Sequence, residues 1–284
     1  MPDVMFTHDR NTVKMMAVQD TMTVIVWIEL NRASMHRREA SMSLARIEFY
    51  SQAMGQHVSY SLYLPDVGEG PFPVLFQLHG LTDSHGAWIE KSNITRHAAG
   101  LPMAIAFPDG GTAAYLNWIG HDRIGKRLYE DMIITDITSH LKRHFNVTDG
   151  PWAIGGLSMG GYGSMRIGLK YPDMFASIWS HSSKFEWEGI MESGQFADPD
   201  DTDVRHHARA LLNAANKPVI TFDCGTEDEL LEESRRFDQY LTGLGIEHTY
   251  NEHPGGHEWD YWDKHVQTAL EQHARVLGIS RVEG

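Results

Sequence analysis

Hydrophobic and polar positions alternate along residues 45–65, and this pattern predicts two β-strands that pair as an antiparallel hairpin. The segments ARIEFYS and HVSYSLYLP carry the alternation and are separated by QAMGQ. Five later segments are short apolar runs that end in small or polar residues: PVLFQLHG, PMAIAFPDG, WAIGGLS, FASIWSHS and PVITFDCG. Such runs are typical of strands that are buried on both faces of a parallel sheet.

Helical periodicity falls between these strands, at about residues 92–99, 127–144, 159–171, 204–215, 229–243 and 258–277. Regular alternation of strands and helices predicts an α/β fold with a mostly parallel central sheet and helices on both faces. No repeat, low-complexity stretch or Pro/Gly linker divides residues 42–284, so we predict one domain there. Residues 184–203 lack periodicity and form one long insertion, a type of loop that is often functional.

The first 41 residues differ from the rest of the chain. Seven of the 14 methionines fall within residues 1–42, and the basic and acidic residues of the first 40 positions cancel. We interpret residues 1–41 as an extension outside the domain formed by residues 42–284. The alternative is that residues 23–28 form an ordinary strand that docks on the sheet.

Composition excludes several classes of partner. The chain has 284 residues, of which 42% are hydrophobic, and a net charge of −14, so a polyanion such as nucleic acid is repelled. No apolar run reaches the roughly 18 residues of a membrane-spanning helix, and the start does not resemble a signal peptide. The single cysteine, Cys224, offers neither an internal disulfide nor a zinc cluster. We therefore expect a cytoplasmic protein without a nucleic-acid or membrane partner.

A candidate nucleophile follows the buried segment WAIGG. Residues 156–160, GLSMG, match the pattern G-x-S-x-G between a predicted strand and a predicted helix. A sharp strand-to-helix turn strains the serine backbone and lifts the hydroxyl above the sheet, while the flanking glycines leave room. The match alone is weak, but this context is what a nucleophile elbow requires. We predict Ser158 as the nucleophile.

A serine hydroxyl needs a base, and the base needs an orienting acid. In α/β-hydrolases the acid follows a late strand, and PVITFDCGTEDEL places Asp228 just past one. A helix cap is the alternative role of Asp228. Asp223, Glu227 and Glu229 compete for the acid position, although Asp223 is still on the predicted strand.

The base is expected on the loop after the next strand. His257 follows Pro-Gly-Gly there and directly precedes the last predicted helix, whereas His253 is the second candidate. We interpret the i, i+4 pair His140 and His144 and the neighbours His206 and His207 as surface residues rather than metal ligands.

Two backbone donors are expected to stabilise the charge that develops on the carbonyl oxygen during acyl transfer. One is the N–H of Met159, directly after the nucleophile. The other is the N–H of Leu81, in the loop LFQLHGLTDSHGAW after the third strand of the domain, where Gly80 lets the backbone approach.

Four tryptophans lie on loops that we expect beyond the strand ends: Trp88, Trp118, Trp187 and Trp259. As a cluster they could line a substrate pocket, and the alternative is that each packs between loops and helices. Rigid aromatic walls favour a small or flat acyl group over a long flexible one.

The segments LHGLTDSHGAW, LYEDMI, GLSMGGYGSMRIGLKYPDMFAS, CGTEDEL and GGHEWDYW follow the order seen in the putative-esterase family, which the chain resembles over roughly residues 42–277. The family includes tributyrin esterases, feruloyl esterases, S-formylglutathione hydrolases and antigen-85-like acyltransferases, and the tributyrin esterases are the nearest branch. The resemblance implies an α/β-hydrolase fold, no cofactor or metal, and the triad and oxyanion roles given above. Asp83 stands where formylglutathione hydrolases usually carry a cysteine, which argues against that activity.

We therefore expect a serine carboxylesterase that hydrolyses short-chain acyl, feruloyl or acetylated carbohydrate esters through an acyl-serine. An antigen-85-like acyltransferase shares these catalytic residues and differs in what takes the place of water. A peptidase or lipase on the same fold is a further alternative. A non-catalytic binding protein would be expected to have lost part of the triad. The sequence leaves open the natural substrate and whether the chain forms a homo-oligomer.

Overall fold

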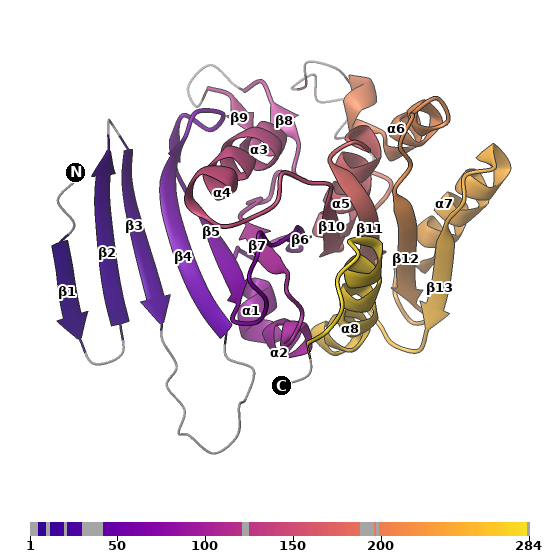
Figure 1. Ribbon diagram of the computed structural model, residues 1–284. Coiled ribbons are helices and arrows are strands. Elements are labelled where there is room, and N and C mark those ends of the chain that lie inside the picture. Colours follow the sequence, from indigo (N-terminus) through magenta and orange to yellow (C-terminus); the bar gives the residue numbers. More distant parts are fainter. Residues whose placement is uncertain are drawn as a thin grey trace.

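A single 11-stranded sheet, twisted along its length, runs through the protein (Figure 1). The computed structural model describes residues 5–9, 12–19, 22–29, 42–120, 125–187, 196 and 199–282. The strand order is β1-β2-β3-β4-β5-β7-β6-β10-β11-β12-β13. The sheet has an antiparallel part toward the N-terminus and a parallel part that holds most of the apolar strands.

The parallel part confirms the five strands predicted from the apolar runs and has one more strand at its edge. It consists of β7 (Ala104–Pro108), β6 (Val74–Leu78), β10 (Trp152–Leu157), β11 (Phe175–His181), β12 (Val219–Gly225) and β13 (Thr249–His253). Neighbouring strands in this order pair in parallel. Every residue of β6, β7 and β10 is buried, because helices cover both faces of the sheet.

The predicted hairpin forms the section of the antiparallel part that adjoins the parallel strands, as β4 (Met42–Ser51) and β5 (Gln56–Pro65). β3 (Met22–Glu29) pairs with β4, β2 (Thr12–Gln19) pairs with β3, and β1 (Met5–Asp9) pairs with β2. Three strands from residues 1–41 thus continue the sheet beyond β4, and β3 includes the residues that we considered as an alternative docked strand. That the functional domain is complete without this segment stays a prediction.

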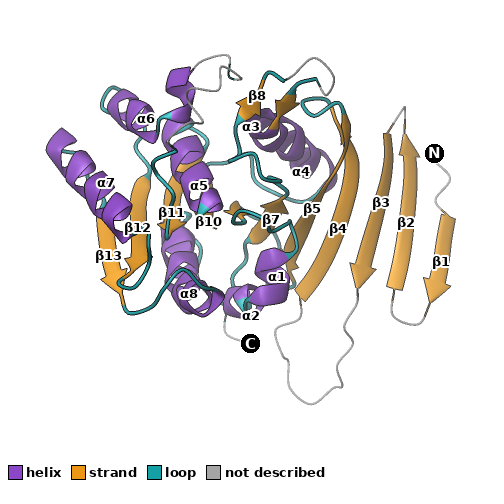
Figure 2. Cartoon of the chain, turned by 180° about the vertical axis from the view of Figure 1, so that it is seen from behind, coloured by secondary structure: helices purple, strands orange, loops and turns teal. Residues whose placement is uncertain are grey.

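Helices cover the two faces of the sheet in separate groups (Figure 2). On one face lie α1 (Ala87–Lys91), α2 (Ile94–Ala98) and α8 (Trp259–Val276), around a core that includes Trp88, Val266 and Leu270. The other core holds residues of α4 (Thr138–His144), α5 (Met159–Lys170), α6 (Val204–Leu211) and α7 (Leu231–Leu244). α3 (Tyr129–Asp131) and a π-helical turn (Met132–Ile137) lead into α4. Within the described ranges, no helix combines the length and apolarity needed to cross a membrane.

Short elements complete the chain between the larger ones. β8 (Asn117–Trp118) and β9 (Arg127–Leu128) form a separate two-stranded sheet, and a 3-10 turn spans Pro199–Thr202. Asp203 caps α6, since its side chain accepts the N–H of Arg205 at 2.9 Å. Gly245 ends α7 in the left-handed conformation, with a φ of 70°.

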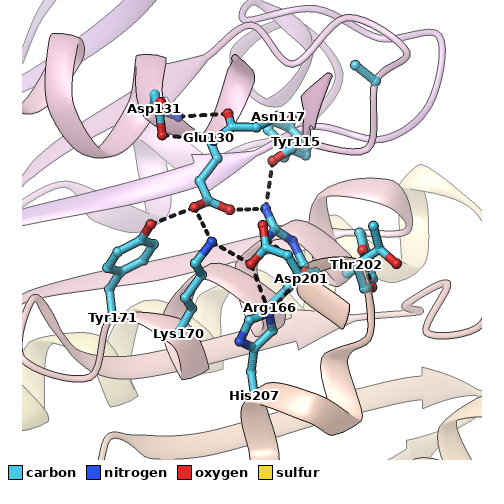
Figure 3. A network of polar contacts seen from close by, with 12 residues as sticks. Tyr115, Asn117, Glu130, Asp131, Arg166, Lys170, Tyr171, Asp201, Thr202 and His207 are labelled. Atoms are coloured by element: carbon cyan, nitrogen blue, oxygen red, sulfur yellow. Dashed lines mark hydrogen bonds and ion pairs between the residues drawn. The ribbon is translucent and has the colours of Figure 1, made fainter. Parts of the chain in front are cut away.

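A buried ion network fixes helix α5 to its surroundings (Figure 3). The Arg166 guanidinium lies 2.5 Å from the Glu130 carboxylate, and both side chains are almost fully buried. Lys170 bonds both Glu130, at 2.8 Å, and Asp201 of the 3-10 turn, at 2.5 Å. Burial raises the pKa of Glu130, but Arg166 and Lys170 outweigh it and keep this pKa below its usual range. The network therefore ties α3 and the end of the long insertion to α5.

Two histidines that the sequence analysis placed on the surface are buried, and those predictions are wrong. His140 lies on α4, and its buried ring has Nδ1 2.9 Å from the Tyr60 hydroxyl. His207 lies on α6, and its Nε2 is 3.0 Å from the Asp201 carbonyl. Helical spacing alone does not reveal which face of a helix meets the sheet. Among the described residues, no group of three His, Cys, Asp or Glu side chains could hold a metal ion.

Candidate active site

Ser158, Asp228 and His257 meet at one edge of the sheet. Ser158 directly follows β10, while Asp228 and His257 lie on the loops after β12 and β13. Because these strands are parallel, their carboxyl ends lie at the same edge, which is where ligands bind in open α/β sheets. The topology thus brings together three residues that are far apart in the chain.

The backbone at Ser158 is strained, as the G-x-S-x-G motif predicts. Its φ is 54°, in the left-handed region that a non-glycine residue rarely adopts. A Cβ on Gly156 would lie 2.4 Å from the Gly160 carbonyl oxygen, and one on Gly160 would lie 2.5 Å from the Leu78 carbonyl oxygen. Both motif glycines are therefore required by close approach of the backbone. The Ser158 N–H donates to the His181 carbonyl at 2.9 Å, which holds the turn in place.

Hydrogen bonds link the three side chains in series. Nε2 of His257 lies 3.0 Å from Oγ of Ser158, and Nδ1 of His257 lies 2.9 Å from Oδ2 of Asp228. An ionised carboxylate only accepts, so Nδ1 carries the proton and Nε2 is free to accept the serine proton. The arrangement can therefore activate a serine hydroxyl as a nucleophile.

Asp228 also caps the turn before α7, because its Oδ1 accepts the N–H of Leu230 at 2.8 Å. The cap and the partnership with His257, which were alternatives in the sequence, are both present. Burial raises the pKa of Asp228, but the hydrogen bonds from His257 and from Leu230 outweigh it and hold the pKa below its usual range. The carboxylate is therefore ionised at neutral pH.

The competing residues make other contacts. Asp223 is buried and accepts hydrogen bonds from Trp179, His181 and Tyr261. The Glu227 carboxylate accepts the N–H of Gly255, and the His253 ring stacks on His265 at a centroid distance of 4.2 Å. Glu229 lines the pocket over Ser158. Within the described part of the chain, Asp228 is the only carboxylate hydrogen-bonded to His257.

Leu81 and Met159 both line the pocket that opens over Ser158. Met159 is the first residue of α5, where the helix presents free N–H groups and a partial positive charge. The loop after β6 passes close to the nucleophile, since a Cβ on Gly80 would lie 3.7 Å from Cβ of Ser158. The structure thus places both residues around the pocket over the candidate nucleophile, and their role as oxyanion donors stays a prediction.

The pocket measures about 870 Å³ and has aromatic walls from Trp187, Trp259 and Trp262. Trp262 was missed in the sequence analysis. Its ring lies 4.9 Å from the His257 ring, edge to face. A sequence signal was present, because Trp259 and Trp262 are three positions apart at the start of the last helix and so share a face.

The other two predicted tryptophans do not line this pocket. Trp88 is buried beneath it, where Nε1 donates to the Leu78 carbonyl at 2.9 Å and the ring packs edge-on against Trp259 at 5.3 Å. Trp118 packs on Phe196 at a centroid distance of 4.5 Å. Trp88 is buried because it lies on the first turn of α1, which faces the sheet. Trp88 therefore packs behind Trp259, which forms part of the pocket wall.

Known proteins resemble this chain in sequence and in fold. The chain is 27% identical over 268 residues to an acetyl esterase of Caldicellulosiruptor saccharolyticus, covering 83% of this chain and 99% of the relative. An S-formylglutathione hydrolase structure from Agrobacterium tumefaciens has the same fold, with a TM-score of 0.76 and 22% identity over 88% of this chain and 99% of that one. FphF, a fluorophosphonate-binding serine hydrolase of Staphylococcus aureus, gives a TM-score of 0.71 and 23% identity over 81% and 98%. The family described as "Putative esterase" matches residues 51–273. The chain therefore belongs to this family and is a carboxylic-ester hydrolase with the α/β-hydrolase fold.

Proposed function

We propose that the protein hydrolyses carboxylic esters through an acyl intermediate on Ser158. One observation carries the proposal: Nε2 of His257 lies 3.0 Å from the Ser158 hydroxyl, while Asp228 holds the other ring nitrogen at 2.9 Å. His257 takes the serine proton as Oγ attacks the ester carbonyl carbon. The Asp228 carboxylate stabilises the imidazolium that forms.

The attack produces a tetrahedral intermediate whose oxyanion accepts hydrogen bonds from the N–H groups of Leu81 and Met159. Collapse of this intermediate breaks the bond to the alcohol, which leaves with the proton held by His257. A water molecule then gives its proton to His257 and attacks the acyl carbonyl. The second collapse releases the carboxylic acid and restores the Ser158 hydroxyl.

We propose small-molecule esters with short acyl groups as substrates, including acetylated carbohydrate and feruloyl esters. The flat indole walls of the pocket and the name of the acetyl esterase relative support this class. Asp83 forms an ion pair with Lys91, and this pair occupies the position where a formylglutathione hydrolase usually has a thiol. We therefore do not propose formylglutathione as the substrate.

A cytoplasmic location is part of the proposal. Cys224 is buried and free, and burial raises its pKa to about 12, so the thiol stays protonated and unreactive. A lone unreactive thiol fits a compartment in which disulfides do not form. Fractionation of the source cells tests the location: the protein, detected with a specific antibody, and its ester hydrolysis should both appear in the cytoplasmic fraction.

The test of the reaction is labelling with a fluorophosphonate, which forms a stable adduct with an activated serine. We expect one adduct per chain, on the peptide that holds Ser158, and hydrolysis of p-nitrophenyl acetate by the unlabelled protein. Ser158→Ala should lose the adduct and about 10³-fold or more in kcat. Ser164→Ala is the matched control, because this buried serine lies on α5, the helix that follows Ser158, and its hydroxyl donates to the Gly161 carbonyl.

Near-normal turnover by a folded Ser158→Ala variant would refute the proposal. An added alcohol separates hydrolysis from acyl transfer. If the acyl group appears mainly on the alcohol at low alcohol concentration, the acyltransferase alternative replaces the hydrolase.

A further inference from the structure

The orientation of the predicted donor Leu81 N–H is set by the carbonyl of Gly80. These two groups belong to one peptide unit, which is planar and trans, so they point in opposite directions. The Gly80 carbonyl oxygen lies 2.7 Å from Nδ1 of His79 and accepts the N–H of Asp83 at 3.3 Å. Whatever holds this carbonyl also directs the Leu81 N–H.

The hydrogen bonds of His79 select one tautomer of its ring. Its side chain is buried, and Nε2 lies 2.9 Å from the N–H of Gly110. A backbone N–H can only donate, so Nε2 is the acceptor and Nδ1 carries the proton that bonds Gly80. The Asp109 carboxylate is 3.7 Å from Nε2, which is too far for a hydrogen bond. His79 is therefore a donor directed at the Gly80 carbonyl.

Tyr115 holds the backbone of His79 at both of its polar groups. The Tyr115 hydroxyl accepts the His79 N–H at 2.9 Å and donates to the His79 carbonyl at 3.0 Å. The ring is fully buried between two glycines, since a Cβ on Gly110 would lie 2.3 Å from it and one on Gly163 would lie 2.7 Å from it. Gly163 belongs to α5, so Tyr115 packs directly on the helix that follows Ser158.

The Tyr115 backbone is strained and is held by the ion network. Its φ is 57°, and that of Ala114 is 54°, both in the left-handed region. Nη2 of Arg166 donates to the Tyr115 carbonyl at 2.8 Å, and Glu130 holds Arg166 in turn (Figure 3). A strained residue that is fixed at its carbonyl, ring and hydroxyl has its position fully determined.

We propose that His79 and Tyr115 are positioning residues that direct the Leu81 N–H at the oxyanion, with Arg166 as the anchor of Tyr115. This inference rests on the proposed ester hydrolysis. Neither side chain lines the pocket over Ser158. Their effect is therefore on the transition state and not on substrate binding, so their loss lowers kcat and leaves KM unchanged.

The first test is Tyr115→Phe, which removes one hydroxyl and keeps the ring between the two glycines. Loss of a whole oxyanion donor costs about 10²–10³-fold in kcat, and a misdirected donor costs part of that. We expect kcat on p-nitrophenyl acetate to fall about 10-fold or more, with KM changed less than about two-fold. His79→Leu, which removes the donor to Gly80 and leaves Tyr115 in place, should give the same kcat and KM pattern.

Tyr60→Phe is the control for loss of a buried hydroxyl. Tyr60 lies on β5, and its hydroxyl bonds His140 of α4; neither residue lines the pocket over Ser158. We expect a similar drop in melting temperature for Tyr60→Phe and Tyr115→Phe, but a wild-type kcat for Tyr60→Phe alone.

A thionoester substrate gives a readout that a merely structural role would not change. Its C=S sulfur is a poor hydrogen-bond acceptor, so a well-directed donor favours the ordinary ester over the thionoester. Tyr115→Phe and His79→Leu should lose part of this preference, and Tyr60→Phe should keep it. The inference is overturned if kcat is unchanged, or if kcat falls while the preference stays as in the wild type. Failure of the wild-type protein to label with fluorophosphonate would instead overturn the proposed function.

Discussion

Oδ2 of Asp223 accepts a hydrogen bond from Nδ1 of His181 at 2.8 Å, and this buried pair lies behind the candidate triad. The carbonyl of His181 accepts the N–H of Ser158, while Trp179 and Tyr261 also donate to Asp223. Burial raises the pKa of Asp223, but His181 and the other donors outweigh it and keep the carboxylate ionised. Asp223 thus joins β11, β12 and α8 just below the three candidate residues.

Asp228 bonds His257 of the candidate triad, whereas Asp223 bonds residues that support the triad, so the first prediction is that the same substitution at the two positions affects different properties. Asp228→Asn should leave the fold intact and lower kcat strongly, although somewhat less than Ser158→Ala does, because the amide no longer orients and stabilises the imidazolium. Asp223→Asn should mainly lower stability, by about 1–3 kcal/mol, because its amide N–H₂ faces a donor and leaves it unpaired. Melting curves and kcat on p-nitrophenyl acetate check both variants. A folded Asp223→Asn variant that loses more kcat than Asp228→Asn would reverse the assignment.

The second prediction separates His257 from His253. His257→Ala should lose about 10³-fold or more in kcat, as Ser158→Ala does, because the two side chains act as a unit. His253→Ala should keep near-normal turnover, since this ring stacks on His265 and makes no hydrogen bond to Ser158. Added imidazole should restore part of the activity of His257→Ala. Equal losses in both variants would count against the proposed base.

The sequence was sufficient to predict the fold class and to select three side chains that the structure brings together, for a physical reason. A nucleophile elbow needs small residues on both sides of the serine, and parallel pairing puts the loops after the later strands at the same edge of the sheet. Ser158, Asp228 and His257 could therefore be placed from local patterns. Leu81 and Met159 followed because backbone donors depend on position rather than on residue type.

The direction of side chains on loops and covered helices could not be predicted. Trp88 turns toward the sheet, whereas Trp262 turns toward the pocket. Helix α5 is buried along almost all of its length, so it has no polar face that would reveal Arg166 as a core residue. The contact between Arg166 and Tyr115 joins two distant segments, and no local pattern indicates it.

The third prediction concerns pH. Burial, with nearby His144 and Arg143, lowers the pKa of His140 to about 4, and burial lowers that of His273 to about 3. Their unfolded pKa is about 6.5, so below that pH the unfolded chain binds more protons than the folded one. The contribution of these histidines to the free energy of unfolding should be fully present above pH 6.5. It should fall as the pH drops toward 4, by up to about 1.4 kcal/mol per pH unit for each histidine.

Urea unfolding at several pH values measures this dependence. His140→Gln and His273→Gln should each flatten the decline between about pH 6.5 and 4, because one buried proton acceptor is removed. Both variants will be less stable at neutral pH, so the slope rather than the absolute value is the result. Unchanged slopes in both variants would contradict the assignment to these histidines.

The fourth prediction is that a chain beginning at Met42 keeps its activity and melting temperature. β4 pairs with β5 along its whole length, and its buried residues Ala45, Ile47 and Phe49 belong to the main core. These contacts should keep β4 in place in the absence of β3. A chain beginning at Gln52 is the control and should fail to fold, because it lacks β4. A large loss of melting temperature in the first chain would show that β1–β3 belong to the functional domain.

The last prediction concerns the length of the acyl group. Trp259 packs edge to face on both Trp88 and Trp262, at 5.3 and 5.4 Å, so this wall is rigid, and Trp262 in turn contacts the ring of His257. Charged side chains also reach the pocket: Asp83, Lys91, Lys184, Glu229 and Glu258. A long acyl chain would pass these charges and would lose about 0.5–1.5 kcal/mol for each group that becomes immobilised.

We therefore expect kcat/KM on p-nitrophenyl esters to be highest from acetyl to butyryl and to be poor beyond about eight carbons. Trp259→Ala, which opens the rigid wall without touching Ser158, should shift the maximum toward longer chains. Trp118→Ala is the matched control and should keep the wild-type profile, because Trp118 packs on Phe196 away from this pocket. A wild-type maximum at about twelve carbons or more would mean that an extended lipid-binding groove, and not a short aromatic pocket, receives the acyl group.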